Sequence, residues 1–159
     1  MNTAMTYQTS SQSSEKTGQL AAEIGARLRG GEVIVLTSDL GGGKTAFVRG
    51  LARGMGSADH VASPTFTISR EYKAPAKGLT LYHFDFYRLQ EPGLIAHELA
   101  ETIDDPEAVI AIEWGQIVED VLPEQQMAVE IVRTGESTRQ FTFNYPSELA
   151  YLLPEGMPC

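Results

Sequence analysis

The chain has 159 residues and a formal net charge of −9, and this length predicts one domain with a sizeable core and no separate substrate domain. Lysine and arginine together number 12 against 21 acidic residues, which argues against unaided binding to a nucleic acid, because such binding needs a clustered basic face. The single cysteine, Cys159, excludes an internal disulfide and a cysteine-based zinc site.

The two ends of the chain look different from its middle. Residues 1–14 are rich in Ser, Thr, Gln and Asn, and this composition predicts a disordered tail. Residues 15–153 are expected to form the single domain, followed by a loose tail over residues 154–159. No stretch approaches the run of about 18 apolar residues that a transmembrane helix needs, and the first residues lack the features of a signal peptide. We therefore expect a cytoplasmic protein with no membrane contact.

The first half of the predicted domain reads as helix, strand, loop and helix. Leu20, Ile24 and Leu28 recur at helical spacing after a possible N-cap at Thr17. The β-branched run over residues 32–37 predicts a buried strand. An apolar stripe after the following glycine-rich segment predicts a second helix (Ala46, Phe47, Val48, Leu51, Ala52 and Met55).

The segment between that strand and the second helix predicts a phosphate-binding loop. Such a loop uses glycines where backbone N–H groups surround phosphate oxygens, a lysine that reaches the β- and γ-phosphates, and a hydroxyl that holds Mg²⁺. Gly43, Lys44 and Thr45 supply these groups, while Ser38 stands where the motif G-x-x-x-x-G-K-S/T has its first glycine. The residues expected to contact the nucleotide are Asp39, Leu40, Gly41, Gly42, Gly43, Lys44, Thr45 and Ala46.

The second half of the chain completes an α/β sheet. A loop running into a strand over residues 62–72 and a strand over residues 79–87 are expected to pair antiparallel. A helix over residues 94–103 precedes the apolar run 108–112, which is typical of a central parallel strand covered on both faces. Beyond it, two alternating runs around Gly135 and Glu136 predict a hairpin near the C-terminus. The order of elements predicts the three-layer P-loop NTPase fold, with a mixed, mostly parallel sheet flanked by helices.

Two carboxylates at predicted strand ends are candidates for catalysis and for Mg²⁺. Glu113 follows the apolar run 108–112, and Asp85 follows the preceding strand; ligands of open α/β sheets lie at such strand ends. One carboxylate is expected to join Thr45 in the metal shell and the other to orient the attacking water. The sequence leaves open which does which. Lys44 is expected to act with them on the phosphates.

Three further residues are candidates for nucleotide sensing. Thr65 lies between the loop helix and the next strand, where nucleotide-sensing switch loops commonly lie. Its hydroxyl is a candidate catalytic group that contacts Mg²⁺ or the γ-phosphate, with a plain turn as the alternative. Trp114 directly follows Glu113 and is a candidate sensor of the γ-phosphate, with a core aromatic as the alternative. Asp39 is a candidate either to cap the helix or to contact the attacking water.

Two patterns are absent from the sequence, and their absence restricts the range of ligands to consider. The spacing of His60, His83 and His97 is not typical of a metal site, so each is interpreted as a surface or packed residue. No N-K-x-D guanine-reading motif occurs, since the only asparagines are Asn2 and Asn144. ATP with Mg²⁺ is therefore favoured over GTP.

The order of the motifs resembles the bacterial TsaE (YjeE) family of small ATPases. The motifs are Ser38-Asp-Leu-Gly-Gly-Gly-Lys-Thr45, Ser63-Pro-Thr-Phe66, Tyr82-His-Phe-Asp-Phe-Tyr-Arg88 and Glu113-Trp114. The resemblance extends from about Thr17 to Asn144. In that family the loop usually begins Gly-Asp-Leu-Gly and has alanine before its last glycine, so Ser38 and Gly42 depart from the pattern.

The resemblance implies a role in making threonylcarbamoyladenosine beside the anticodon of tRNAs that read ANN codons. It implies that the chain, a monomer when isolated, associates with the TsaB–TsaD complex on its TsaD side and contacts tRNA only through that complex, where ATP hydrolysis supports repeated turnover. It also implies that Lys44 and Thr45 bind phosphate and Mg²⁺. Thr65 would belong to a first switch, and Glu113 with Trp114 to a second, while Asp85 would be the acid after the histidine strand.

Two other functions remain open from the residues alone. In a small-molecule kinase, Asp85 would activate an acceptor hydroxyl, although the chain length leaves little room for a lid or acceptor pocket. In a nucleotide-dependent binding module without hydrolysis, Ser38 would mark a degenerate loop. Lone P-loop switches can hydrolyse nucleotide at only about 10⁻⁴ to 10⁻² s⁻¹, so a test of these alternatives must include the partner proteins.

Overall fold

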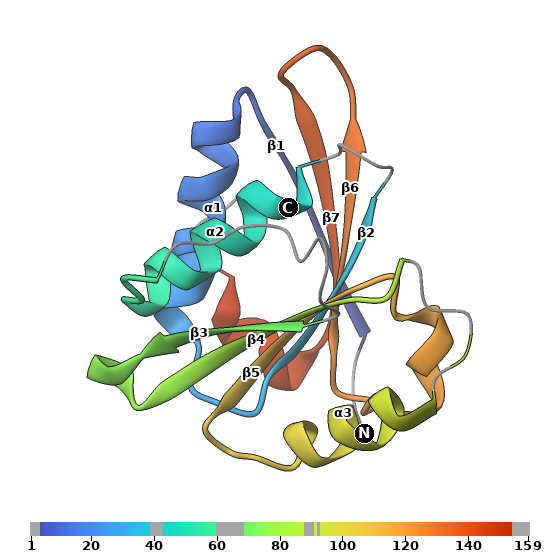
Figure 1. The fold of residues 1–159 in the computed structure, drawn as a ribbon. Helices are drawn as coiled ribbons and strands as arrows, with labels where there is room; N and C mark the ends of the chain where they lie inside the picture. The colour runs from blue at the N-terminus through green and yellow to red at the C-terminus, as the bar shows by residue number, and fades with distance from the viewer. Residues whose placement is uncertain (1–3, 39–42, 60–68, 88–90, 92, 154–159) are drawn as a thin grey trace.

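A seven-stranded sheet runs through the computed structural model, which describes residues 4–38, 43–59, 69–87, 91 and 93–153 (Figure 1). The predicted loose tail over residues 154–159 lies outside these ranges. The strands are β1 (Ala4–Ser11), β2 (Val33–Ser38), β3 (Ser69–Ala74), β4 (Leu79–Asp85), β5 (Ala108–Glu113), β6 (Met127–Arg133) and β7 (Arg139–Pro146). The helices are α1 (Ser14–Arg27), α2 (Lys44–Met55) and α3 (Gly93–Ile103), with short 3-10 segments η1 (Pro75–Lys77), η2 (Gly115–Val121) and η3 (Ser147–Leu152).

The sheet is evenly mixed, in the order β1-β7-β6-β2-β5-β4-β3. β2 pairs in parallel with β5 and β6, and β4 pairs in parallel with β5. The pairs β1–β7, β6–β7 and β3–β4 are antiparallel. The predicted mixed sheet, its C-terminal hairpin and the antiparallel β3–β4 pair are confirmed. The expectation of a mostly parallel sheet is wrong, because β1 adds to the antiparallel pairs of the two hairpins.

Residues 4–11 form the edge strand β1, so the prediction of a disordered tail is wrong for this part of the chain. β1 pairs with β7 along its whole length. Tyr7 is buried, and its ring centroid lies 6.0 Å from that of Phe143. Polar composition hides such a strand, because its ladder is made by backbone groups and only a few of its side chains need to be buried.

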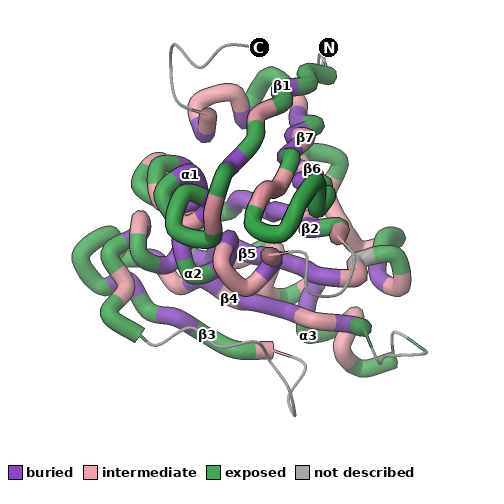
Figure 2. Tube along the Cα trace, turned by 90° about the horizontal axis from the view of Figure 1, so that it is seen from above, coloured by how far each residue is buried: buried purple, intermediate pink, exposed green. Residues whose placement is uncertain are grey.

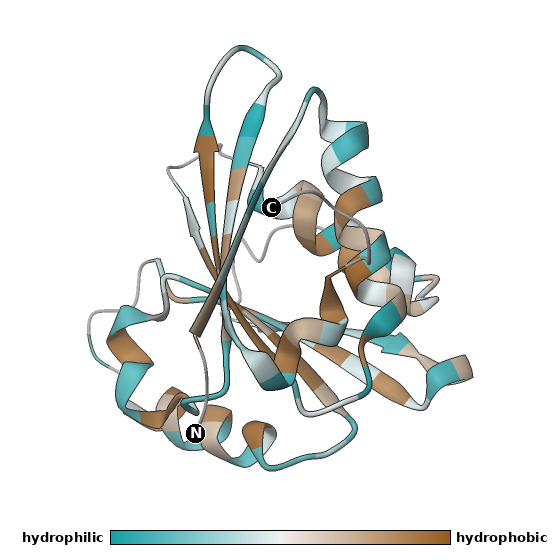
Figure 3. Ribbon diagram, turned by 180° about the vertical axis from the view of Figure 1, so that it is seen from behind, coloured by the Kyte–Doolittle hydropathy of each residue, from teal (hydrophilic) through white to brown (hydrophobic). Residues whose placement is uncertain are grey.

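The helices cover the two faces of the sheet unequally. α1, α2 and η3 pack on one face, over a core that includes Phe47, Phe141 and Phe143. α3 and η2 pack on the other face, over β2, β5 and β4. β5 is buried at every position, as predicted for a central parallel strand. Buried residues concentrate along the central strands (Figure 2), and hydrophobic residues lie along the same strands (Figure 3). Within the described residues, no helix is long and apolar enough to cross a bilayer.

α1 begins one turn earlier than predicted. The hydroxyl of Ser13 accepts a hydrogen bond from the backbone N–H of Lys16 at 3.1 Å and caps the helix. Thr17, the predicted cap, instead lies inside the first turn, where its buried hydroxyl is 2.6 Å from that of Ser11. The end of β1 is thereby tied to the start of α1.

α1 and α2 approach so closely that glycine is required where they touch. A Cβ atom on Gly50 would overlap the carbonyl oxygen of Gly18, and one on Gly54 would overlap that of Ala22. These contacts pair Gly18 and Ala22 of α1 with Gly50 and Gly54 in the second half of α2, in the same order, so the two helices run in the same direction. The close contact holds α2 against α1.

We predict that Gly50→Ala destabilises the chain. The added methyl group must push the two helix backbones apart, and we expect the free energy of unfolding in urea to fall by about 1–3 kcal/mol. Gly18→Ala is the matched control, because a Cβ at Gly18 meets nothing within 4 Å and alanine favours the helix by up to about 1 kcal/mol. Equal stability of the two variants would contradict this account of the contact.

Candidate functional site

The candidate site lies where β4, β5 and β2 end. Asp85 and Glu113 are Cα partners at the ends of β4 and β5, and Leu36 of β2 is the partner of Glu113 on its other side. Parallel pairing places these strand ends at one edge of the sheet, where ligands of α/β proteins bind. The two carboxylates that the sequence singled out therefore lie beside each other.

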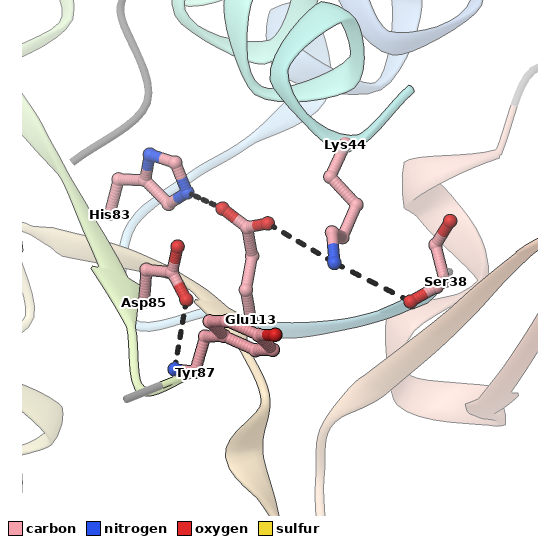
Figure 4. A network of polar contacts seen from close by, with 6 residues as sticks. All are labelled: Ser38, Lys44, His83, Asp85, Tyr87 and Glu113. Atoms are coloured by element: carbon pink, nitrogen blue, oxygen red, sulfur yellow. Dashed lines mark hydrogen bonds and ion pairs between the residues drawn. The ribbon is translucent and has the colours of Figure 1, made fainter. Parts of the chain in front are cut away.

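Lys44 reaches this edge from the first position of α2. Gly43 precedes it with a φ of 105°, a conformation that favours glycine and turns the chain into the helix. The Lys44 side chain is only 7% exposed. Its Nζ lies 3.5 Å from Oε1 of Glu113 and 3.5 Å from the carbonyl oxygen of Ser38 (Figure 4). These oxygens compensate a buried ammonium group that would otherwise be costly.

The carboxylate of Glu113 is shared between two partners. While Oε1 faces Lys44, Oε2 lies 2.5 Å from Nε2 of His83 on β4 (Figure 4). His83 is fully buried, as one branch of its sequence interpretation allowed, but its contact with Glu113 was not predicted. Strand alternation carried the signal, since His83 lies two residues before Asp85 and so points to the same face of the sheet.

Trp114 also contacts Lys44. It is the only non-glycine residue with a positive φ in the described part of the chain, at 60°. Nζ of Lys44 lies 4.9 Å from the centroid of the Trp114 ring. The centroid of the Tyr87 ring, just after the end of β4, lies 5.0 Å from that of Trp114. An ammonium over an indole face is favourable, and a left-handed backbone at a bulky residue stores strain of about 1–3 kcal/mol. The strained turn after β5 thus places this ring at the site.

Asp85 is half-buried and carries a perturbed carboxyl group. Its Oδ1 accepts a hydrogen bond from the backbone N–H of Tyr87 at 3.0 Å. Burial raises the pKa of Asp85, and the negative charge of Glu113 raises it further, against the opposing effects of the Tyr87 N–H, His83 and Lys44. The Asp85 carboxyl group is therefore easier to protonate than an ordinary aspartate.

The other predicted site residues fall into two groups. Thr45 and Ala46 lie in the first turn of α2, both partly exposed. The remaining ones lie outside the described residues, namely Asp39, Leu40, Gly41, Gly42 and Thr65.

A cleft of about 180 Å³ opens beside the start of α2. It lies between the first turns of α1 and α2 and the turn that joins β6 to β7. Its lining residues are Ser14, Thr17, Gly43, Ala46, Glu136, Ser137 and Arg139. Nε of Arg139 lies 3.6 Å from the position that a Cβ on Gly43 would take. The contact between Gly43 and Arg139 was not predicted, because no short sequence motif indicates a contact between residues so far apart along the chain.

The oxygen donors of the site fit Mg²⁺. Thr45 offers a hydroxyl group, and Asp85 and Glu113 offer carboxylates, all of which are hard donors. Within the described ranges, no three His, Cys, Asp or Glu side chains are placed to hold a metal ion together. Mg²⁺ is commonly held by one or two protein carboxylates together with nucleotide phosphates, so this small donor set suits an ion that arrives with a nucleotide.

Comparison with known proteins gives one consistent result. The family model described as threonylcarbamoyl adenosine biosynthesis protein TsaE matches residues 11–141. The tRNA threonylcarbamoyladenosine biosynthesis protein TsaE of Bacillus subtilis is 36% identical over 130 residues, which cover 81% of this chain and 79% of that protein. The protein of the same name from Treponema pallidum is 36% identical over 132 residues, covering 83% and 96%. A crystal structure of Bacillus subtilis YdiB is similar with a TM-score of 0.66 at 32% identity, covering 91% of this chain and 87% of that one.

The raised pKa of Asp85 predicts a pH-dependent cost to stability. The pH window lies between the ordinary pKa of 3.8 and the raised pKa of the folded chain. At a pH within it, the Asp85 carboxyl group is protonated in the folded chain and ionised in the unfolded chain. The free energy of unfolding therefore falls as pH rises through that window. Asp85→Asn removes the ionisation and keeps an acceptor for the Tyr87 N–H. We expect this variant to be more stable than wild type at pH 7 and the gain to vanish as the pH falls below 3.8.

Urea denaturation across the pH range measures this difference. Asp105→Asn is the control, because Asp105 also accepts a backbone N–H bond, from Glu107 at 2.9 Å, but lies before β5 at the opposite end from Glu113. A stability gain of Asp85→Asn that persists unchanged at low pH would show that the gain has another origin.

Proposed function

The chain belongs to the TsaE family, whose members take part in tRNA threonylcarbamoyladenosine biosynthesis, and we propose that it is the ATPase component of that machinery. In this proposal it binds and hydrolyses Mg-ATP in concert with a TsaB–TsaD complex. The observation that carries the proposal is the position of Lys44. Its side chain extends from the first turn of α2 to the carboxylate of Glu113 at the end of β5.

The phosphates bind at the start of α2. Backbone N–H groups at a helix N-terminus attract anions, and Gly43 lets the chain approach them without a side chain in the way. Lys44 exchanges its contact with Glu113 for the β- and γ-phosphates. The hydroxyl of Thr45 and the carboxylate of Glu113 would hold Mg²⁺. Glu113 is the second ligand because its strand, β5, is the neighbour of β2, the strand that leads into the loop. When bound there, Mg²⁺ would supply positive charge that neutralises the charge developing on the phosphates.

Asp85 orients the attacking water. In hydrolysis the water oxygen bonds to the γ-phosphorus as the bond to the β–γ bridging oxygen breaks, and a proton leaves the water. Asp85 accepts that proton, and its raised pKa makes it a better proton acceptor than an ordinary aspartate. Trp114, which contacts Lys44 at the site, senses whether the γ-phosphate is present.

The nucleoside occupies the cleft beside Gly43. The cleft adjoins the proposed phosphate site through Gly43 and Ala46, and its volume of about 180 Å³ suits a planar base with part of its sugar. The Arg139 guanidinium lies at this wall and can stack on a base or pair with a phosphate oxygen.

In this proposal, partner proteins make the contact with tRNA. A net charge of −9 disfavours direct contact with a polyanion, so the chain, monomeric when isolated, contacts tRNA through the TsaB–TsaD complex. Coupling to partners also accounts for a small domain without an acceptor domain.

We predict that Arg139→Gln weakens nucleotide binding more than it slows chemistry. Loss of the guanidinium removes binding energy that is equal in the ground and transition states, so KM for ATP should rise about tenfold with kcat nearly unchanged. Arg133→Gln is the matched control, because Arg133 is the Cα partner of Arg139 on β6 and its guanidinium binds the carbonyl oxygen of Gly135 in the exposed turn. A kcat effect without a KM effect would place Arg139 elsewhere in the cycle.

The central test is ATP hydrolysis by the purified chain, without and with TsaB, TsaD and tRNA. We expect strong stimulation by the partners, and Lys44→Ala should reduce turnover to background while circular dichroism shows an intact fold. Lys73→Ala, at an exposed position of β3, serves as the control. Unchanged turnover in Lys44→Ala would overturn the site assignment. No hydrolysis by any mixture would indicate a binding module, and transfer of the γ-phosphate to a metabolite would indicate a kinase.

A further inference from the structure

His83 is a buried polar residue to which the proposed chemistry assigns no task. Its side chain is fully inaccessible to solvent, and its Nε2 lies 2.5 Å from Oε2 of Glu113. Within the part of the chain that the structure describes, Nδ1 has no hydrogen-bond partner. A buried nitrogen without a hydrogen-bond partner costs free energy, so the presence of His83 at this position calls for an explanation.

The fold places the imidazole beside Glu113 by strand register. His83 is the Cα partner of Ala111 on β5, and Glu113 follows Ala111 by two residues on the same face. Because Ala111 carries only a methyl group, the ring has room to reach diagonally to the carboxylate. Figure 4 shows the imidazole pointing at one carboxylate oxygen while Lys44 faces the other.

The partners of the ring define its tautomer. Nε2 faces a carboxylate, which accepts hydrogen bonds, so the ring proton that is satisfied lies on Nε2. A proton on Nδ1 would be a buried donor with no acceptor among the described residues. The arrangement is therefore an imidazole that donates its Nε2–H to the Glu113 carboxylate.

We propose that His83 is a positioning residue for Glu113. Its hydrogen bond holds Oε2 in place, so that Oε1 is the carboxylate oxygen that can exchange one partner for another. In the structure Oε1 faces Nζ of Lys44 at 3.5 Å. When the lysine turns to a nucleotide, Oε1 stays aimed at the same place because the other oxygen is held. The carboxylate then meets Mg²⁺ without first having to be ordered. This inference rests on the proposed ATPase function and adds a residue to it.

Steady-state kinetics on the full chain with its partners tests the role. We expect His83→Leu to lower kcat about 10- to 100-fold, because Glu113 loses its fixed orientation, with a much smaller change in the affinity for ADP without Mg²⁺. His83→Gln, whose amide N–H can also donate, should recover part of the loss. Leu81→Val is the matched control, because Leu81 is fully buried on the same strand and face and does not contact Glu113. A His83→Leu chain with the kcat of wild type would overturn the proposal.

A double substitution separates this role from plain destabilisation. If His83 acts through Glu113, then His83→Leu should lower kcat little further in a Glu113→Gln background, because the carboxylate that it orients is already gone. Effects on kcat that multiply fully would mean that His83 acts independently of Glu113 and would overturn the proposal.

Nitrogen-15 NMR of histidine-labelled chain gives a readout that needs no nucleotide and no folded His83 variant. We expect the buried imidazole to carry its proton on Nε2, and the Nε2–H signal to shift in Glu113→Gln but not in Leu81→Val. A proton on Nδ1, or a signal indifferent to Glu113, would overturn the contact. If wild type hydrolyses no ATP in any mixture, the proposed function fails, and the spectrum alone still decides whether His83 holds Glu113.

Discussion

Four neighbouring parallel strands that must be covered on both faces are the constraint on which the molecule depends. The strands β6, β2, β5 and β4 cannot expose either face of the sheet to water, so α1 and α2 are needed on one side and α3 with η2 on the other. The same arrangement brings the ends of β2, β5 and β4 to one edge. The polar groups at that edge are consequently gathered where the chain leaves its apolar core, and the first turn of α2 lies directly above them.

Burial at this edge makes the polar groups depend on one another. Lys44, Glu113 and His83 are each almost wholly removed from water, and no one of them is acceptable there alone. The carboxylate serves both neighbours at once, and the Trp114 ring adds a favourable surface for the ammonium. A site of this kind is preorganised, because rearranging one member leaves another without its partner.

Much of the fold follows from the sequence because its signals are local. The apolar run of β5 and the alternation in the C-terminal hairpin each specify their own structure over a few residues. Asp85 and Glu113 were singled out because each follows a predicted strand, and the structure pairs those two strands in parallel. β1 was missed because residues 4–11 carry no strong strand pattern of their own. They form a strand by pairing with the backbone of β7, which lies far along the chain. His83 and Arg139 were missed for the same reason, since each acquires its meaning from a distant neighbour.

The glycine contact between α1 and α2 joins the two helices into one mechanical unit. Helices whose backbones touch cannot slide past each other without separating, so a displacement at the Lys44 end of α2 carries α1 with it. The hydroxyl pair of Ser11 and Thr17 continues this path from α1 to β1, at the far edge of the sheet. Glycine, usually regarded as a source of flexibility, here makes the domain stiffer, and the outermost strand becomes a place where events at the start of α2 can be observed from a distance.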